Sequence, residues 1–265
     1  MKYTKIAICI SGEVRTAIEA YPVFKNFFEG MDVDVFIHTW NTTVVKTKNM
    51  EEPFIIHEDD DKINKIKELY QPKKMIVENQ IEVGPYESFS KMFYSIMMSN
   101  QLRLDYEIEN ECLYEWVVKY RFDVIFPKEI KFPKLQLEKR TLYYLLGNQG
   151  IVKEDCGAHG ISDIIFWGDP QIMTILCDSY RYYKFNLTKT LKSSLNGIYY
   201  SRDVNKSLYS PGQIIYKRAV DYNIRPCESK LDGFFIPHTL WRTDSKELDP
   251  FSDYYKIDER YKKDA

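Results

Sequence analysis

Apolar and polar positions along the first 126 residues follow two kinds of pattern, one typical of strands and one typical of helices. Residues 6–10 are continuously apolar and β-prone, which predicts a central strand buried on both faces that stops at Ser11 and Gly12. Residues 13–30 then show helical spacing, and 33–40 predict a second strand. The same patterns predict a helix over 59–70, a strand over 74–78, a helix over 88–109 and a strand over 115–126. This alternation favours an α/β fold with a mostly parallel central sheet flanked by helices.

The second half of the chain carries shorter and less regular signals. They predict β-prone pieces over 141–146 and 161–167, helices over 170–183 and 210–222, and late strands over 234–236 and 239–241. The sequence has no internal repeat, low-complexity tract or clear linker, so residues 1–265 are expected to form one domain. Within it we distinguish an N-terminal half, 1–126, a C-terminal half, 127–242, and a charged C-terminal tail, 243–265.

Composition narrows the class of protein. The chain has 37 Lys and Arg against 39 Asp and Glu, and this balance excludes a global attraction to nucleic acid. Its five cysteines show no C-x-x-C spacing, which argues against a zinc knuckle or a secreted disulfide framework and fits a reducing cytoplasm. Because no apolar run approaches the ~20 residues of a transmembrane segment, a soluble, cytoplasmic protein is expected. The 21 Tyr and 15 Phe leave room for a peripheral membrane contact, and the oligomeric state stays open.

The segment 116–126 holds the most informative charges. On a strand, its even positions form one apolar face, and its odd positions place Lys119, Arg121 and Asp123 together on the other face. Such a row is a solvated face of a half-exposed strand, an ion-pair network or a binding site. In the last case Asp123 would bind Mg²⁺ or Mn²⁺ that bridges ligand phosphates, and Arg121 would neutralise phosphate oxygen directly.

Several short motifs occur along the chain in one order. They are Ser11-Gly12-x-x-Arg15, Asp34-Val-Phe-Ile-His-Thr-Trp40, Ser90-Lys-Met-Phe-Tyr-Ser95, Tyr120-Arg-Phe-Asp123, and Ile161-Ser-Asp163 with Trp167-Gly168. In this order the chain resembles glycosyltransferases of polysaccharide biosynthesis that are related to the WavE-type lipopolysaccharide synthesis proteins and have a GT-A-like, Rossmann-like fold. The resemblance implies that 1–126 bind a nucleotide-sugar donor and that 127–242 bind a glycan or lipid-linked saccharide acceptor.

The resemblance also suggests a metal site, with one departure. In GT-A enzymes a D-x-D motif at the end of a strand holds a metal ion and the nucleotide diphosphate, and Arg121-Phe122-Asp123 resembles its counterpart. The implied cofactor is Mn²⁺ or Mg²⁺, with Asp123 as its ligand. Because Arg121 replaces the first acid, three alternatives stay open: weaker metal binding, a metal shared with Asp163, or no metal, with Arg121 as a fixed cation.

The turn after the first predicted strand supplies the remaining donor-binding candidates. Ser11, Gly12 and Arg15 lie where open α/β sheets bind nucleotides, beyond the carboxyl end of a strand. Gly12 permits close backbone approach and Arg15 can reach a phosphate; the alternative is a plain turn with an exposed arginine. Asp163 interrupts an apolar run and is either a turn residue or the catalytic base that deprotonates the acceptor hydroxyl. His38 shares a strand face with aromatic residues and is expected to be a hydrogen-bonded core histidine.

Two other polar stretches receive structural interpretations. The acidic run 58–61 precedes an amphipathic helix and predicts a solvated helix N-terminus instead of a second D-x-D motif. The glycine-rich stretch 150–160 predicts a loop that closes over the donor, and its Cys156 and His159 match no zinc spacing.

The patterns that are missing also limit the function. The sequence has neither a G-x-G-x-x-G motif nor a Walker loop, which counts against dinucleotide and ATP chemistry of those kinds. We therefore expect a glycosyltransferase. Two alternatives stay open: a catalytically degenerate module that binds nucleotide or glycan, favoured by Arg121 at the first D-x-D position, and another nucleotide-dependent transferase that moves nucleotidyl or phosphoryl groups.

Overall fold

The computed structural model describes most of the N-terminal half of the chain and parts of the C-terminal half. The described residues are 5–45, 54–80, 88–126, 128, 130–133, 138–145, 161, 163–182, 211–228, 230–231, 234–235 and 239–240. The predicted loop 150–160, with Cys156 and His159, and the predicted tail 243–265 lie outside these residues.

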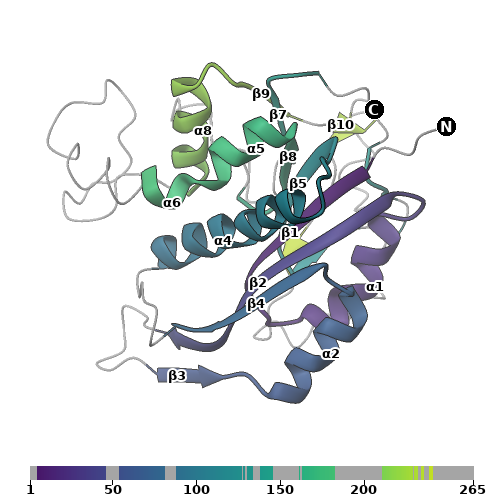
Figure 1. Cartoon of the computed structure of the whole chain (residues 1–265), viewed down its shortest axis with the longest axis vertical. Helices are drawn as coiled ribbons and strands as arrows, with labels where there is room; N and C mark the ends of the chain where they lie inside the picture. The colour runs from purple at the N-terminus through teal and green to yellow at the C-terminus, as the bar shows by residue number, and fades with distance from the viewer. Residues whose placement is uncertain are drawn as a thin grey trace, which may run out of the picture.

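Four parallel strands form the centre of the sheet, in the spatial order β4-β2-β1-β5 (Figure 1). The elements follow the chain as β1 (Lys5–Glu13), α1 (Ala17–Phe27), β2 (Asp32–Val45), α2 (Asp60–Tyr70), β4 (Lys74–Asn79), α4 (Ser88–Glu109) and β5 (Trp116–Tyr120). From β1 the chain moves outward to β2 and β4, and α4 then returns it to β5 on the other side of β1. The expected Rossmann-like, mostly parallel α/β sheet is confirmed, and its direction of winding reverses between β1 and β5.

Antiparallel strands extend the sheet at both edges. β3 (Phe54–His57) pairs with the end of β2, and β8 (Phe166–Gly168) runs antiparallel to β5. Beyond β8 lie β7 (Thr141–Tyr144) and β9 (Arg225–Glu228), so the described residues form an eight-stranded sheet. The other described elements are α5 (Pro170–Cys177), α6 (Ser179–Tyr182), α8 (Pro211–Asp221) and two small pairs, β6 (Val124–Ile125) with β12 (Thr239–Leu240) and β10 (Lys230–Leu231) with β11 (Phe234–Phe235).

Helices cover both faces of the sheet (Figure 1). An apolar core lies between the sheet and the helices on each face. Ile6, Ile8 and Ile10 belong to the core under α1 and α2, whereas Ala7 and Cys9 belong to the core under α4, α5 and α8. Because alternate side chains of β1 point to opposite faces, a strand covered on both sides is apolar at every position. Among the described helices, none combines the length and apolar character that a bilayer crossing requires.

The strand predicted over 115–126 is shorter than expected. β5 ends at Tyr120, residues 121–123 form a turn, and β6 pairs with β12 in a separate small sheet. The apolar pattern continues through the turn because Tyr120, Phe122 and Val124 all pack into the core under α1. The prediction that Arg121 and Asp123 lie on one continuous strand face is therefore wrong, although the two side chains still meet.

Other boundaries also differ from the predictions. β1 continues through Ser11 and Gly12 to Glu13, because these residues pair with β2, which itself extends to Val45. The helix predicted over 170–183 consists of two helices, α5 and α6, which are separated at Asp178. The sequence patterns do not predict β3, β9 or β10.

The acidic run 58–61 forms the start of α2, as expected. Asp59 caps this helix, since its side chain accepts a hydrogen bond from the backbone N–H of Asp61 over 2.9 Å. The alternative of a second D-x-D motif is thereby removed.

Candidate functional site

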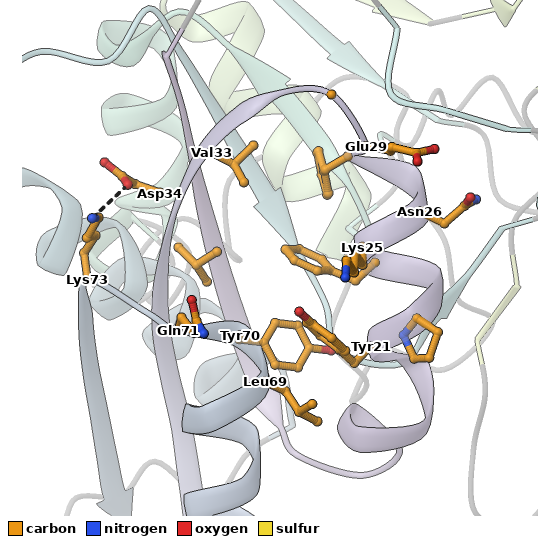
Figure 2. Close-up of a pocket in the computed structure, with 15 residues that line it drawn as sticks. Tyr21, Lys25, Asn26, Glu29, Val33, Asp34, Leu69, Tyr70, Gln71 and Lys73 are labelled. Carbon is orange, nitrogen blue, oxygen red and sulfur yellow. Dashed lines mark ion pairs between the residues drawn. The ribbon is translucent and has the colours of Figure 1, made fainter.

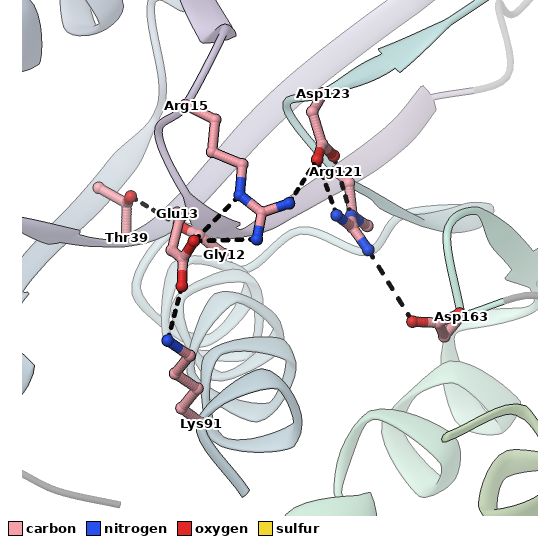
Figure 3. Close-up of polar contacts among 8 residues, drawn as sticks. All are labelled: Gly12, Glu13, Arg15, Thr39, Lys91, Arg121, Asp123 and Asp163. Atoms are coloured by element: carbon pink, nitrogen blue, oxygen red, sulfur yellow. Dashed lines mark hydrogen bonds and ion pairs between the residues drawn. The ribbon is translucent and has the colours of Figure 1, made fainter. Parts of the chain in front are cut away.

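Charged residues from distant parts of the sequence meet beyond the carboxyl ends of β1 and β5. Arg15 follows β1, and Arg121 and Asp123 follow β5 (Figure 3). β1 and β5 are the neighbouring parallel strands between which the direction of winding reverses. In open α/β sheets ligands bind at this position, because the loops after the two strands diverge there.

Arg121 and Asp123 form a two-point ion pair across the turn after β5. Arg121 Nε donates to Asp123 Oδ1 over 2.9 Å, and Arg121 Nη2 donates to Oδ2 over 2.7 Å. The Asp123 side chain is 3% exposed and that of Arg121 is 18% exposed. The carboxylate therefore lies beneath the guanidinium group, and the pair is not a solvated surface pair.

Arg15 binds the same carboxylate from the β1 side. Its Nη1 donates to Asp123 Oδ2 over 2.9 Å, and its Nε donates to Glu13 Oε2 over 3.0 Å. Lys91 of α4 lies on the far side of Glu13, with its Nζ 2.6 Å from Oε1. We call Lys91, Glu13, Arg15, Asp123 and Arg121 the charged row: cations and carboxylates alternate along it, and a cation stands at each end (Figure 3).

The conformation of Arg15 is unusual. Its φ angle is +33°, in the left-handed region that residues with a side chain seldom adopt. Such conformations gather at binding and catalytic sites, where the surrounding contacts enforce them. Here the ion pairs with Glu13 and Asp123 hold the guanidinium group in place, and 32% of the Arg15 side chain remains exposed.

Burial and ion pairing act on the carboxylates of the row in opposite directions. Burial alone would raise the pKa of Asp123, but the charges and hydrogen bonds of Arg121 and Arg15 outweigh it and hold that pKa below its ordinary value. In the same way Lys91 and Arg15 overcome burial and lower the pKa of Glu13. Both carboxylates are ionised at neutral pH and serve to hold the arginine heads.

A buried network holds the main chain of Gly12. Its N–H donates to Ser95 Oγ over 2.8 Å, and its carbonyl oxygen accepts from Thr39 Oγ1 over 2.7 Å. Ser95 Oγ also lies 2.8 Å from His38 Nδ1, and His38 Nε2 lies 2.9 Å from Glu78 Oε2. The His38 side chain is fully buried, so the prediction of a hydrogen-bonded core histidine is confirmed. Because Ser95 accepts the Gly12 N–H, that group is not free to bind a phosphate.

The predicted turn residues thus differ in what they offer a ligand. Ser11 is buried within β1, and the Gly12 amide is engaged by Ser95. Arg15 alone among these three presents a partly exposed charged side chain.

Asp163 reaches the site from the C-terminal half. It precedes β8, whose first residue pairs with the end of β5 because the two strands are antiparallel. Its Oδ2 lies 4.0 Å from Arg121 Nη1, and its side chain is 30% exposed. It is therefore more exposed than Glu13 and Asp123, the two carboxylates of the charged row.

Lys119 binds the backbone of the segment that carries Asp163. Its fully buried Nζ donates to the backbone carbonyl oxygens of Asp163 and Ile164, the second over 3.2 Å. Burial lowers the pKa of Lys119 to about 7. The sequence pattern places Lys119 in a row with Arg121 and Asp123, whereas in the structure it holds the backbone that carries Asp163.

The geometry of Asp123 does not suit a divalent metal ion. Both of its oxygens accept hydrogen bonds from guanidinium groups, so a metal ion bound there would lie beside two positive charges. In the described part of the chain, no three His, Cys, Asp or Glu side chains gather closely enough to hold a metal ion. The exposed groups of the row are donors of hydrogen bonds, which suits an anion.

The sequence patterns do not single out Glu13, Lys91 or Ser95. Lys91 and Ser95 are four residues apart on α4 and therefore share one helix face, which lies against the end of β1. Both belong to the motif Ser90–Ser95, and this spacing is the signal that would have indicated them. Glu13 carries no such signal, because its role depends on how far β1 extends.

A separate hollow lies at the opposite edge of the sheet (Figure 2). Its volume is about 650 Å³, and the C-terminal ends of α1 and α2 enclose it together with the start of β2. Tyr21 and Tyr70 stand side by side within it, and Lys73 pairs with Asp34 at its rim. Because it lies near the amino ends of the parallel strands, it shares no residue with the charged row.

The likeness of the chain to known proteins is distant. No protein-family model and no curated protein sequence matches the chain. Among solved structures, the chain is similar to a nucleoside-diphosphate-sugar pyrophosphorylase from Vibrio cholerae RC9, with a TM-score of 0.42 and 12% identity over 95% of this chain and 100% of that chain. A likeness this distant supports no conclusion about function, which we infer from the geometry of the site.

Proposed function

We propose that the protein is a glycosyltransferase that moves a sugar from a nucleotide-sugar donor to a glycan or lipid-linked saccharide acceptor. The observation that carries the proposal is the position of Arg15 and Arg121, two partly exposed guanidinium groups beyond neighbouring strands at the point of reversed winding. The planar fork of arginine matches the oxygens of a phosphate group, and a diphosphate is the group that leaves a nucleotide-sugar. The order of the sequence motifs supports the same assignment.

Each charged residue of the site then has a role. Arg15 and Arg121 bind the diphosphate and stabilise the charge that it gains as its bond to the anomeric carbon breaks. Asp123 and Glu13 hold the two arginine heads in position. Asp163 is the proposed base, which takes the proton of the acceptor hydroxyl as its oxygen bonds to the anomeric carbon. Its 4.0 Å distance from Arg121 supports this role, because it brings the carboxylate to the same site as the proposed diphosphate contact.

A second candidate is a binding module without catalytic activity. Its support is the pairing of the carboxylates. Glu13 and Asp123 each bind two cations, so that among the described carboxylates of this site Asp163 alone is left to act as a base. Such a protein would bind the nucleotide-sugar and leave it intact.

The test is a binding and turnover assay on the full-length chain with a panel of UDP-, GDP-, CDP-, ADP- and dTDP-sugars. We expect at least one donor to raise Tm, because a ligand that binds only the native state stabilises it, and to be slowly hydrolysed without an acceptor. Arg121→Gln should lose both effects, Asp163→Asn should keep binding and lose hydrolysis, and Arg140→Gln at the opposite sheet edge should behave as wild type.

Other outcomes would redirect the assignment. Binding without hydrolysis or transfer to any saccharide favours the binding module. Cleavage between the two phosphates, which releases sugar 1-phosphate and no free nucleoside diphosphate, identifies a nucleotidyl transferase. No thermal shift with any member of the panel would overturn the proposal.

A further inference from the structure

We propose that this site binds the donor diphosphate without a divalent metal ion, through Arg15 and Arg121 held in place by Asp123. The proposal rests on the proposed function and adds the way in which the site recognises its ligand. It assigns Asp123 as a positioning residue for two arginines, where the motif resemblance implies a metal ligand.

The hydrogen bonds of Asp123 are the first argument. Oδ1 accepts from Arg121 Nε, and Oδ2 accepts from both Arg121 Nη2 and Arg15 Nη1. Metal binding at this carboxylate would require both guanidinium groups to leave it. Arg121 would then lose the carboxylate that binds it within 3 Å among the described residues, and Arg15 would keep only Glu13. Because the Asp123 side chain is almost fully buried, breaking its pairs is costly.

Accessibility is the second argument. An approaching ligand meets Arg15 and Arg121 before it meets Asp123, because the two arginines are partly exposed and the carboxylate lies beneath them. Arg121 Nη1 has no hydrogen-bond partner among the described residues, since its nearest carboxylate oxygen, Asp163 Oδ2, is 4.0 Å away. In the proposed complex the N–H groups of Arg121 Nη1, which Asp123 does not use, bind a phosphate oxygen, whereas Nε and Nη2 of Arg15 stay on Glu13.

The charged row supplies the third argument. Arg15 is held between Asp123 and Glu13, and Glu13 is itself held by Lys91 of α4. Long arginine side chains lose much rotamer freedom when they bind an anion, but here the ion pairs have fixed them beforehand. The row itself contains one more cation than carboxylates, and Asp163 lies 4.0 Å beyond Arg121, so the positive charge offered to a diphosphate is local to the two arginine heads. A metal ion would normally provide that positive charge.

The experiment measures binding of UDP, GDP, CDP, ADP, dTDP and inorganic pyrophosphate to the full-length chain by isothermal titration calorimetry. Each titration is made once with EDTA and once with Mn²⁺. We expect at least one nucleoside diphosphate to bind in EDTA, with an affinity that Mn²⁺ changes by less than about threefold. In EDTA, Arg15→Lys and Arg121→Lys should each weaken binding at least about tenfold, because lysine cannot make the forked contact.

The variant Asp123→Asn distinguishes two roles of Asp123, namely positioning of the arginines and binding of a metal ion. If Asp123 positions the arginines, this variant weakens binding in EDTA and in Mn²⁺ alike, whereas loss confined to the Mn²⁺ titration would mean that Asp123 binds metal. Arg140→Lys is the matched control for arginine replacement and should bind as wild type does. Arg140 immediately precedes β7, which runs parallel to β5, so it lies at the end of the sheet opposite to the charged row.

Two results would overturn the proposal in different ways. Binding that appears only with Mn²⁺, or that both lysine variants leave unchanged, overturns metal-free recognition by the arginine forks. The transferase assignment then depends on the turnover assay, in which hydrolysis of a donor would still support it. If no nucleoside diphosphate binds in either buffer, the transferase assignment fails as well.

Discussion

Arg15 Nη1 and Asp123 Oδ2 lie 2.9 Å apart, although the two residues are 108 positions apart in the sequence. Their contact joins the turn after β1 to the turn after β5, at the point where the sheet reverses its winding. Because Arg121 shares the same carboxylate, the three side chains form one unit. Loss of any one of them changes the surroundings of the other two.

Asp123→Asn should lower the free energy of unfolding by about 2 kcal/mol, because it removes the only negative charge that Arg121 binds within 3 Å among the described residues. The partly exposed guanidinium groups regain some hydration, which keeps the loss below that of a fully buried pair. Urea unfolding of the single variants and of the double variant Arg15→Gln with Asp123→Asn should give a coupling energy of about 1 kcal/mol.

Glu68→Gln is the control for removal of a paired carboxylate. Glu68 binds Lys65 over 2.9 Å on the surface of α2, and its side chain is 69% exposed. Its replacement should change stability by less than about 0.5 kcal/mol. A loss as large as that of Asp123→Asn would show that burial is not what makes the ion pairs of Asp123 costly to break.

The fold could be predicted best where one local pattern was long. The helix over 88–109 has the bounds that its periodicity predicts, because twenty-two residues repeat one helical face. The strand over 115–126 could not be predicted in full, because Phe122 and Val124 return to the same core after the turn. Only pairing with residues far along the chain determines where β5 ends.

Most of the charged residues of the site could be predicted from the sequence, but most of the ion pairs between them could not. Arg121 and Asp123 are two residues apart, so their proximity follows from the sequence. The reach of Arg15 to Asp123 depends on β1 and β5 being neighbours, and the pairing of Glu13 with Lys91 depends on how α4 crosses the sheet. These contacts arise from tertiary packing, which cannot be predicted from the local sequence pattern.

Lys119 should make stability depend on pH. Burial lowers its pKa to about 7, while in the unfolded chain it is about 10.4. Between these values the unfolded chain binds the proton and the folded protein does not, so this group makes wild-type stability rise with pH from 7 to about 10. Lys119→Met lacks this contribution. In urea unfolding, the difference in free energy between wild type and variant should therefore shift in favour of wild type over that range.

The matched control for this pH dependence is Lys65→Met, which removes an exposed lysine of α2. Its difference from wild type should stay constant from pH 7 to about 10. A constant difference for Lys119→Met as well would mean that the folded protein keeps the Lys119 proton with an ordinary pKa.

Ser95→Ala should destabilise the protein by about 1 to 3 kcal/mol, because it leaves the Gly12 N–H without its acceptor beneath the site. Ser99→Ala, one turn further along α4, is the control. Ser99 is equally buried, but its Oγ donates to the carbonyl oxygen of Ile96 within its own helix. Its removal should cost less than about 1 kcal/mol. Thermal unfolding of both variants compares them directly, and equal losses would argue against a special role for the Gly12 contact.

Gly12→Ala should weaken both stability and ligand binding. Gly12 has a φ of +119°, which a residue with a side chain adopts only with strain, although an added Cβ would meet no atom within 4 Å. We expect the free energy of unfolding to fall by about 1 to 3 kcal/mol, and the backbone to shift and displace Arg15.

Gly30 is the matched control, since its φ is +76°, it also has free space for a Cβ, and it lies in the turn before β2. Gly30→Ala should lose stability in urea unfolding but keep the affinity for the nucleoside diphosphate that binds wild type best. If Gly12→Ala keeps that affinity too, the turn after β1 does not position Arg15 for binding.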